Sequence, residues 1–321
     1  MPTATDASPG TVAVIGAGAM GAMYADHLAR VGIRTLIVAD ADRARRLREE
    51  PLTVNGRRLD IEVLDPFDTA DGMPEVDLVL VAVKHAHLAD AVRLAAPLVG
   101  PATTVLSVLN GLDSEDIILA GLRAAGVEVN DEQVPLCIAL AMDAQRAGAA
   151  VRYTQAGRLV FGPADGPVTA GITRIQELLT RAGLAWSTPD DMRHQMWWKF
   201  MVNVGINQAS AVLRAPYGAF QEPGPAYELM MALIEETRAV AAAEGVDLTD
   251  GDVERWRTVL AGQPVAGMTS MHQDVLAGRE TEVAIFAGRV VDIGGEHGIP
   301  VPHNQTMLWI LTARSSDQGE A

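Results

Sequence analysis

Apolar runs and amphipathic segments alternate through the first half of the chain. Apolar side chains fill residues 12–15 and most positions of three further short runs, residues 34–39, 76–83 and 103–109. Runs of this kind are typical of parallel strands that are buried on both faces. Amphipathic helical spacing follows the first run and returns over residues 87–99. The alternation predicts an α/β fold built on a doubly wound parallel sheet.

Other short elements complete this predicted half. Residues 52–63 have a β-hairpin signature with Asn55-Gly56 at the turn, and we expect the hairpin to be peripheral to the main sheet. Three segments are predicted to be closing strands, followed by a helix over 168–182 and a strand over 185–187. The closing strands are residues 134–142, 150–154 and 158–162.

The pattern changes after Pro189, where strand–helix alternation ends and only helical periodicity remains. We therefore predict a tail of residues 1–10 that is disordered, a dinucleotide-binding domain over 11–189 and an all-helical substrate domain over 190–321. The first helix of the second domain is long and apolar, which favours a central buried position. The predicted helices span 191–214, 225–244, 250–261, 267–278, 280–297 and 303–314.

The composition limits the classes of protein to which this chain can belong. The 321 residues are 49% hydrophobic but contain no apolar run of membrane-spanning length, and residues 1–10 lack the features of a signal peptide. The single cysteine, Cys137, excludes an intramolecular disulfide framework and fits a reducing cytoplasm. The formal net charge of −16 argues against nucleic acid and anionic membranes as partners. An anionic small ligand is still compatible with it.

A glycine-rich turn directly follows the first predicted strand. Gly16, Gly18 and Gly21 have the spacing G-x-G-x-x-G, and Ala19 and Met20 open the helix after it. In a dinucleotide site the first glycine allows the tight turn, the second admits the pyrophosphate, and the third allows close helix–strand packing. The N–H groups at the helix N-terminus would face the phosphates. The alternative is a glycine turn without a ligand.

Further cofactor candidates stand at the ends of the next predicted strands. Asp40 follows the second strand, where an acid commonly binds the adenosine ribose and favours NAD. A basic group, Arg43, Arg45 and Arg46, comes directly after it and could hold a 2′-phosphate instead. The alternative is an aspartate N-cap with a solvated basic helix face. Lys84 stands at the carboxyl end of the third predicted strand, outside which ligands bind in such sheets. Asn110 follows the fourth strand and could point its amide at a bound nicotinamide; the alternative is a turn residue.

Polar residues interrupt the apolar first helix of the second half. Lys199, Asn203 and Asn207 recur every four residues and are expected to share one helix face. Lysine is unusual in such a helix unless it is paired or reaches solvent. The alternative is a snorkelling lysine with two solvated asparagines. A second cluster contains Ser270, Asp274 and Glu282, the last at the start of a predicted apolar helix, where an acid is also a common capping choice.

Taken together, these residues resemble the ketopantoate reductase (2-dehydropantoate 2-reductase) family. The matching pieces span residues 11–305 in the family's order. They are Gly16-Ala17-Gly18-Ala19-Met20-Gly21, Val83-Lys84, Asn110-Gly111, Trp198-Lys199 with Asn203 and Asn207, Ser270-Met271 with Asp274, Thr281-Glu282, and Gly298-Ile299-Pro300-Val301-Pro302 with Asn304.

The resemblance implies a Rossmann-type domain and NADPH-dependent reduction of a 2-oxo acid in a cleft between two domains. The family's catalytic lysine and glutamate fall on Lys199 and Glu282. Its substrate-binding residues match Asn203, Asn207 and Ser270, and Lys84 and Asn110 match positions beside the cofactor. No metal is implied. The partner is a small-molecule 2-oxo acid, and the apolar helical half could supply a homodimer interface.

The chain departs from the family pattern at three places. Asp40 stands where members often carry arginine, Ala284 replaces an acidic residue, and Asn207-Gln208-Ala209-Ser210 replaces a common Asn-Pro-Leu-Thr run. Asp40 leaves NADH open as the coenzyme, whereas Arg43 could take over the phosphate contact. Two other functions also stay open: an opine- or imine-type dehydrogenase on this scaffold, and a non-catalytic NADP(H)-sensing protein.

Overall fold

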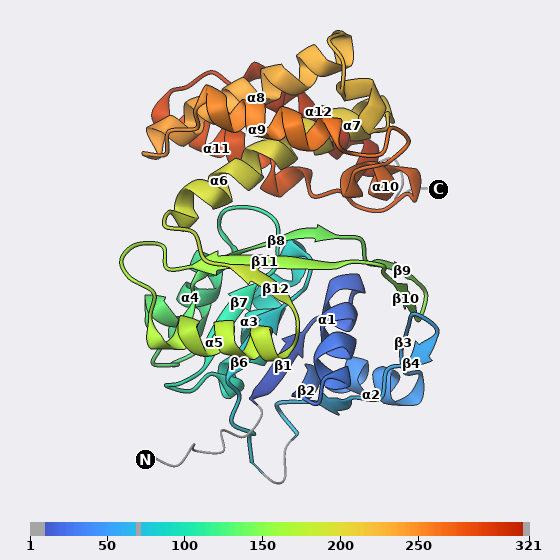
Figure 1. Cartoon of the computed structure of the whole chain (residues 1–321), viewed down its shortest axis with the longest axis vertical. Coiled ribbons are helices and arrows are strands. Elements are labelled where there is room, and N and C mark those ends of the chain that lie inside the picture. The colour runs from blue at the N-terminus through green and yellow to red at the C-terminus, as the bar shows by residue number, and fades with distance from the viewer. Residues whose placement is uncertain (1–9, 69–71, 317–321) are drawn as a thin grey trace. The chain divides into compact units, whose positions relative to one another are not determined.

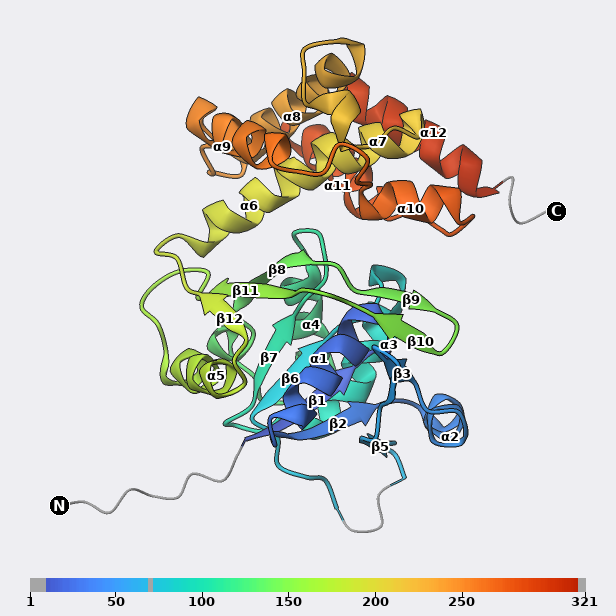
Figure 2. The same cartoon turned by 45° about the vertical axis from the view of Figure 1, so that its right-hand side comes forward.

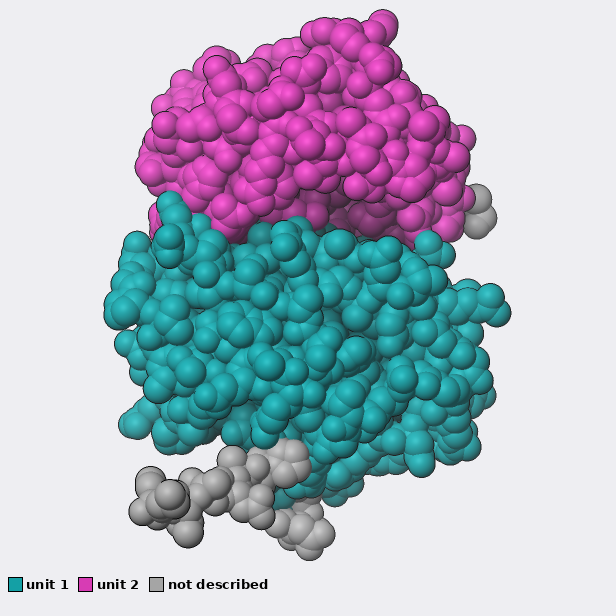
Figure 3. Space-filling model, viewed as in Figure 1, with its two compact units in different colours: residues 1–192 teal, residues 193–321 magenta. Residues whose placement is uncertain are grey.

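The computed structural model describes residues 10–68 and 72–316. The chain forms two compact units, Met1–Met192 and Arg193–Ala321 (Figure 3). The units divide inside the first turn of the helix that opens the second half. The predicted tail, residues 1–10, lies outside the described residues except for Gly10.

A five-stranded sheet organises the first unit. Its strands are β1 (Thr11–Ile15), β2 (Arg34–Val38), β5 (Glu62–Leu64), β6 (Leu78–Val81) and β7 (Thr104–Ser107). The spatial order is β5-β2-β1-β6-β7, and every pairing is parallel (Figure 1). The strand order reverses at β1, so successive connections leave β1 in opposite directions and open a crevice at the strands' carboxyl ends. The predicted doubly wound sheet is thereby confirmed.

Helices cover both faces of this sheet, because alternate residues of each strand point to opposite sides. Val12 and Val14 of β1 join a core that includes α1 (Ala19–Arg30) and α5 (Ala170–Arg181). Ala13 and Ile15 join the other core, with α3 (Leu88–Ala95) and α4 (Ser114–Ala124). Figure 2 shows the two layers on either side of the strands. We did not predict α4, although its acidic first turn is a helix-start signal.

The predicted hairpin is shorter and less peripheral than expected. β3 (Thr53–Val54) and β4 (Arg57–Arg58) pair antiparallel around Asn55 and Gly56, whose φ values of 50° and 79° fit a type I′ turn. The chain then leaves the hairpin, and β5 joins the main sheet instead. Val54 is fully buried against α1, so this segment is part of the core. The apolar side chains of the first arm explain the difference.

Two smaller sheets complete the unit. The first has the order β4-β3-β10-β9, where β9 is Gln145–Ala147 and β10 is Ala150–Arg152. The second has the order β12-β11-β8. Its strands are β8 (Leu136–Met142), β11 (Ala156–Gly162) and β12 (Ala185–Ser187). Of the predicted closing strands, residues 134–142 and 158–162 therefore lie in this sheet as β8 and β11, whereas 150–154 became β10 of the other sheet. The other short elements are α2 (Ala41–Glu49), η1 (His85–His87), η2 (Ala96–Leu98) and η3 (Asp131–Gln133).

The second unit is helical in its described residues. A continuous helix opens it as α6 (Met192–Val202), a π-helical turn η4 (Asn203–Asn207) and α7 (Gln208–Leu213). The prediction of one α-helix over 191–214 therefore missed a π segment, a feature often found at functional sites. The remaining elements are η5 (Tyr217–Phe220), α8 (Pro225–Ala243), α9 (Asp250–Ala261), α10 (Ser270–Leu276), η6 (Val283–Ile285), α11 (Ala287–His297) and α12 (Pro302–Ser316).

The opening helix is buried by its neighbours, as its apolar sequence predicted. Val204 and Ala209 are fully buried, and α8, α10 and α12 all pack against η4 or α7. Gly205 permits the closest approach, because a Cβ there would lie 2.7 Å from Ile234 Cγ1 of α8. Within the two described ranges, no helix has the length and apolar character needed to cross a membrane.

Gly205→Ala should destabilise the protein by about 1–3 kcal/mol, because the new methyl group overpacks the contact with Ile234. Gly295→Ala is the matched control. Its Cβ would meet no atom within 4 Å on the exposed side of α11, so the better helix propensity should raise stability by about 0.5–1 kcal/mol. Urea unfolding measures both; equal effects would contradict tight packing at Gly205.

Candidate active site

The glycine turn has the geometry of a nucleotide-binding loop. Gly16 has φ +104°, and a Cβ there would lie 2.4 Å from the Ala82 carbonyl oxygen after β6. A Cβ on Gly21 would lie 1.8 Å from the Gly16 carbonyl oxygen. These two glycines are therefore required by the protein's own packing. At Gly18 a Cβ would meet no other protein atom nearer than 3.9 Å, so the space that this glycine leaves open fits a phosphate group.

The N-terminus of α1 is suited to an anion. Gly18 is its N-cap and supplies no side-chain hydrogen bond, and the first turn contains no acidic residue. The N–H groups of the first turn, which includes Ala19 and Met20, therefore lack a side-chain acceptor from the N-cap. Such a terminus carries partial positive charge and binds phosphate oxygens. The glycine loop and the helix end together fit a dinucleotide pyrophosphate.

The end of β2 shows how Asp40 and the arginines after it are held. Asp40 is the N-cap of α2, and its Oδ1 accepts a hydrogen bond from the Arg43 backbone N–H at 2.9 Å. Arg45 pairs with Asp42 at 2.7 Å. Asp40 thus performs the capping role that was one of its two interpretations. Arg43 lies in the first turn of the helix with an exposed side chain.

Lys84 and Asn110 follow neighbouring strands. Lys84 is exposed and caps η1 after β6, and Asn110 is partly buried after β7. The two loops lie next to each other, with His85 Nε2 3.3 Å from Asp113 Oδ1. The parallel order β2-β1-β6-β7 therefore places every predicted cofactor residue at the same carboxyl edge of the sheet.

A buried polar chain supports the Asn110 loop, and the sequence analysis missed it. Ser114 Oγ donates to Glu115 Oε2 at 2.7 Å and lies 2.8 Å from Ser107 Oγ. The Ser107 hydroxyl accepts from the Leu109 N–H, one residue before Asn110. The other carboxylate oxygen of Glu115 accepts from the Cys137 N–H at 3.1 Å. Burial raises the pKa of Glu115 to about 7. The sequence does place an acidic residue next to the N-cap of a helix, but hydrophobic periodicity does not show that this residue is buried.

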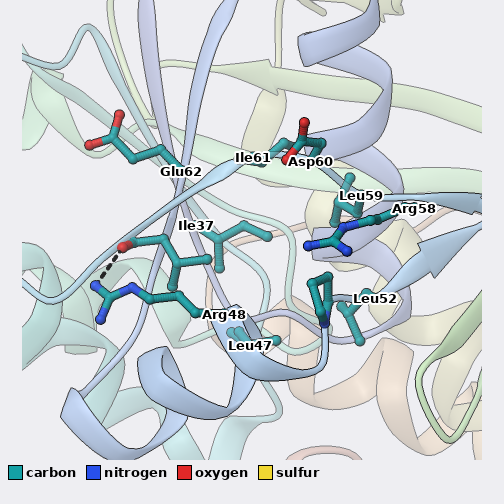
Figure 4. Close-up of a pocket in the computed structure, with 11 residues that line it drawn as sticks. Ile37, Leu47, Arg48, Leu52, Arg58, Leu59, Asp60, Ile61 and Glu62 are labelled. Carbon is teal, nitrogen blue, oxygen red and sulfur yellow. Dashed lines mark hydrogen bonds between the residues drawn. The ribbon is translucent and has the colours of Figure 1, made fainter.

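A separate pocket of about 270 Å³ lies beside β2 and α2. Its apolar wall includes Ile37 and Leu52, and Arg48 crosses one side to donate to the Val63 carbonyl at 2.8 Å (Figure 4). No predicted cofactor or substrate residue lines it. The pocket therefore belongs to the packing of the sheet edge and does not form part of the candidate site.

Lys199 lies on α6 in the second unit, among buried aromatic side chains. Its neighbours Trp198 and Phe200 are 5% and 1% exposed, whereas Lys199 is partly buried. Trp198 Nε1 donates to the Asp252 carbonyl at 3.0 Å, and the Arg255 guanidinium stacks 3.9 Å from the Trp198 ring. Burial lowers the pKa of Lys199 to about 8 from the ordinary 10.5. Such a lysine can donate a proton near neutral pH.

Asn203 and Asn207 mark the two ends of the π-helical turn. They are only 5% and 7% exposed, which contradicts the alternative of two solvated asparagines. We predicted that Lys199, Asn203 and Asn207 share one helix face, but residues four apart lie on the same face only in a regular α-helix. The wider π-helical turn therefore changes the direction of Asn207 relative to the first two. α10 packs against this turn. Two amide side chains are thus held inside the helical unit, close to the helix that begins with Ser270.

Ser270 and Asp274 lie on α10 in different environments. Ser270 is exposed at the first position of the helix, and Asp274 is buried and pairs with Arg279 at 2.8 Å. The preceding residue, Thr269, caps α10 and lies 2.6 Å from Ser210 Oγ of α7 through its hydroxyl. This bond between α7 and the α10 cap fixes the start of α10 against the central helix.

Glu282 does not begin a long helix, so that prediction was wrong. It is the partly buried N-cap of the single turn η6, and α11 starts only at Ala287. Phe286, between the two helices, packs on Phe200 with ring centroids 6.3 Å apart. The segment that carries Glu282 is thereby tied to α6 directly beside Lys199.

Gln208 belongs to the Asn-Gln-Ala-Ser run, one of the departures from the family pattern, and its contacts show how this run fits the fold. Its side chain is fully buried; Nε2 donates to Asn304 Oδ1 at 3.1 Å, and Oε1 accepts from the Ala287 N–H at 3.1 Å. Asn304 Nδ2 then donates to Glu236 Oε2 at 2.8 Å. One glutamine amide therefore joins the central helix to α12 and to the start of α11.

Comparison with protein families gives two matches of one description. The model described as "Ketopantoate reductase PanE/ApbA" matches residues 12–166, and its C-terminal model matches residues 191–315. The chain belongs to the ketopantoate reductase family. It is accordingly an oxidoreductase, and the resemblance stated from its sequence motifs is confirmed.

Named relatives and solved structures agree with this family. The chain is 29% identical to a 2-dehydropantoate 2-reductase of Halobacterium salinarum, covering 95% of this chain and 99% of the relative. The corresponding enzyme of Salmonella typhimurium is 25% identical, with 95% of each covered. A ketopantoate reductase structure from Ralstonia eutropha has a TM-score of 0.79 at 27% identity, over 97% of this chain and 100% of that one. D-mandelate dehydrogenase shares the fold, with a TM-score of 0.82 at 22% identity over 96% and 99% of the chains.

Glu115→Gln should flatten part of this reductase's stability–pH profile. The folded pKa of about 7 exceeds the ordinary 4.5, so the proton on Glu115 stabilises the fold fully below about pH 4.5. This contribution is lost as pH rises to about 7. The wild type should therefore lose about 2–3 kcal/mol more than the variant between pH 5 and pH 8. Denaturant unfolding checks this, with the exposed Glu128→Gln as control; parallel profiles would contradict it.

Proposed function

We propose that this protein reduces a 2-oxo acid to the 2-hydroxy acid with NADPH, and that the substrate is 2-dehydropantoate or a close analogue. The proposal is supported by the family and by relatives named 2-dehydropantoate 2-reductase. The observation that carries it is Lys199, an ammonium group with lowered pKa on a buried helix, followed by two buried asparagines. A helix with a packing role alone does not require a lysine and two asparagines at these buried positions.

Reduction of a ketone requires a hydride at carbon and a proton at oxygen. A bound dihydronicotinamide supplies the hydride. Negative charge then develops on the carbonyl oxygen, and the Lys199 ammonium stabilises that charge and donates a proton to it. The lowered pKa makes this proton easier to release than that of an ordinary lysine. Lys199 is afterwards neutral and is reprotonated by solvent.

The other predicted residues are proposed to hold the substrate. Asn203 and Asn207 offer amide donors and acceptors without added charge, and Ser270 offers an accessible hydroxyl. These groups suit the carboxylate and hydroxyl groups of 2-dehydropantoate. Glu282 is proposed to accept a hydrogen bond from a substrate hydroxyl group and to orient Lys199. The glycine loop, Lys84 and Asn110 are proposed to bind the cofactor, with Arg43 at the ribose end.

Substrate and coenzyme are tested together by following cofactor oxidation optically. The panel contains 2-dehydropantoate, aliphatic and aromatic 2-oxo acids, and 2-oxo acids with amines, each with NADPH and NADH. Highest kcat/KM with 2-dehydropantoate and NADPH supports the proposal. Turnover that requires an amine would assign the opine- or imine-type dehydrogenase. Tight cofactor binding without turnover on any substrate would assign the sensor.

Lys199→Ala should lower kcat about a hundredfold or more, the usual loss for one well-placed oxyanion donor. Cofactor affinity should change little, because the glycine loop is untouched. In the wild type, kcat for reduction should fall as pH rises through about 8, where Lys199 loses its proton. The variant should lack this fall. Near-normal turnover in the variant, or an unchanged pH profile, would exclude Lys199 as the acid.

Glu282→Ala provides the companion test for Lys199. It should raise KM and also slow turnover, and the losses should not add in the Lys199→Ala/Glu282→Ala double variant, because Glu282 orients Lys199 and the two residues act as one unit. Fully additive losses would show independent roles.

Gly18→Ala should weaken dinucleotide binding roughly tenfold or more while leaving stability unchanged, because its methyl group occupies the space proposed for the pyrophosphate. Gly21→Ala is the contrasting variant: its methyl group collides with the Gly16 carbonyl and should destabilise the fold itself. Thermal unfolding and cofactor fluorescence titration measure the two effects. Unchanged binding in Gly18→Ala would place the pyrophosphate elsewhere.

A further inference from the structure

Arg146 reaches the glycine loop from a different part of the first unit. It lies on β9, more than a hundred residues after the loop, and its Nη1 donates to the carbonyl oxygen of Ala17. Its Nε donates to the Gly148 carbonyl at 2.8 Å. These two bonds use two of the five N–H donors of the guanidinium group and fix its plane beside the loop. The sequence motifs gave no indication of this residue.

Arg146 also lies near Arg43. The pKa of the Arg146 guanidinium is lowered, first by partial removal from water and then by the positive charge of Arg43. Like charges repel, so two neighbouring guanidinium groups are unfavourable without an anion. The chain has a net charge of −16 and many carboxylates, yet these two cations converge at the carboxyl edge of β1 and β2.

We propose that Arg43 and Arg146 together bind the 2′-phosphate of the adenosine ribose and set the coenzyme preference for NADPH. The inference deepens the proposed function and rests on it for the choice of a dinucleotide. Arg43 stands on the first turn after β2, where the ribose lies in this fold. Arg146 approaches from the glycine-loop side. Two guanidinium forks together match the several oxygens of a phosphate dianion.

The same arrangement resolves the conflict raised by Asp40. Its Oδ1 accepts the Arg43 backbone N–H as the N-cap of α2, so the carboxylate has a structural role that does not require a ribose hydroxyl. A phosphate beside it would face two positive charges and one negative charge. The balance of charge at this edge therefore favours the phosphorylated ribose.

The test uses fragments that contain no nicotinamide, namely adenosine 2′,5′-bisphosphate and 5′-AMP, titrated calorimetrically into the full-length protein. Arg146→Ala should weaken the bisphosphate about tenfold or more, the cost of losing a charge-assisted contact. It should leave 5′-AMP within about twofold. Arg43→Ala should act in the same direction, and Arg146→Lys should restore only part of the affinity, because lysine lacks the planar fork.

Arg152→Ala is the matched control, since Arg152 is exposed on the adjacent strand β10 and its loss changes the net charge equally. It should not alter the affinity ratio of the two fragments. Equal weakening of both fragments by Arg146→Ala would show that Arg146 only holds the glycine loop. Unchanged binding of both would also overturn the proposal.

The fragment titration is independent of turnover. A wild-type protein that binds the bisphosphate in preference to 5′-AMP, yet fails to reduce 2-dehydropantoate, would retain the arginine pair and lose only the proposed substrate. A wild-type protein that binds both fragments equally would exclude the phosphate site, whatever its activity. NADPH and NADH titrations of the same variants, read by cofactor fluorescence, should repeat the bisphosphate and 5′-AMP pattern.

Discussion

The absence of a side chain at Gly21 is the constraint on which the first unit depends. A Cβ there would lie 1.8 Å from the Gly16 carbonyl oxygen, so α1 can start directly against the end of β1 only with glycine at this position. That contact lets α1 cover one face of the sheet and leaves its N-terminal N–H groups at the carboxyl edge. The proposed phosphate site is therefore a consequence of how the first strand and helix pack.

Buried polar groups fix the second unit in a comparable way. Gln208, Asn304 and Glu236 form a chain of hydrogen bonds that joins three helices. Each group in this chain would be costly to bury alone, so the helices must meet in one register to satisfy all of them. The π-helical turn that holds Asn203 and Asn207 lies directly before Gln208. The same network thus supports the residues proposed to bind substrate.

Three cationic side chains lie at the proposed binding sites, although the chain as a whole is acidic. Arg43 and Arg146 converge beside the nucleotide loop, and Lys199 lies on a buried helix with a lowered pKa. In each case the cation is placed where a ligand anion or a developing oxyanion would offset its cost.

The sequence by itself determined the periodic elements and the local motifs. The apolar run of β1, the G-x-G-x-x-G spacing and the helical periodicity after Pro189 predicted the sheet, the tight glycine turn and the helical half, because strand and helix patterns are local. Only the tertiary structure brought Arg146 to the loop and showed that Glu115 and Gln208 are buried. Those properties depend on side chains from distant segments meeting, and hydrophobic periodicity carries no information about such pairings. The π-helical turn and the shortened helix before α11 also escaped prediction, since packing around Gly205 and Phe286 selects them.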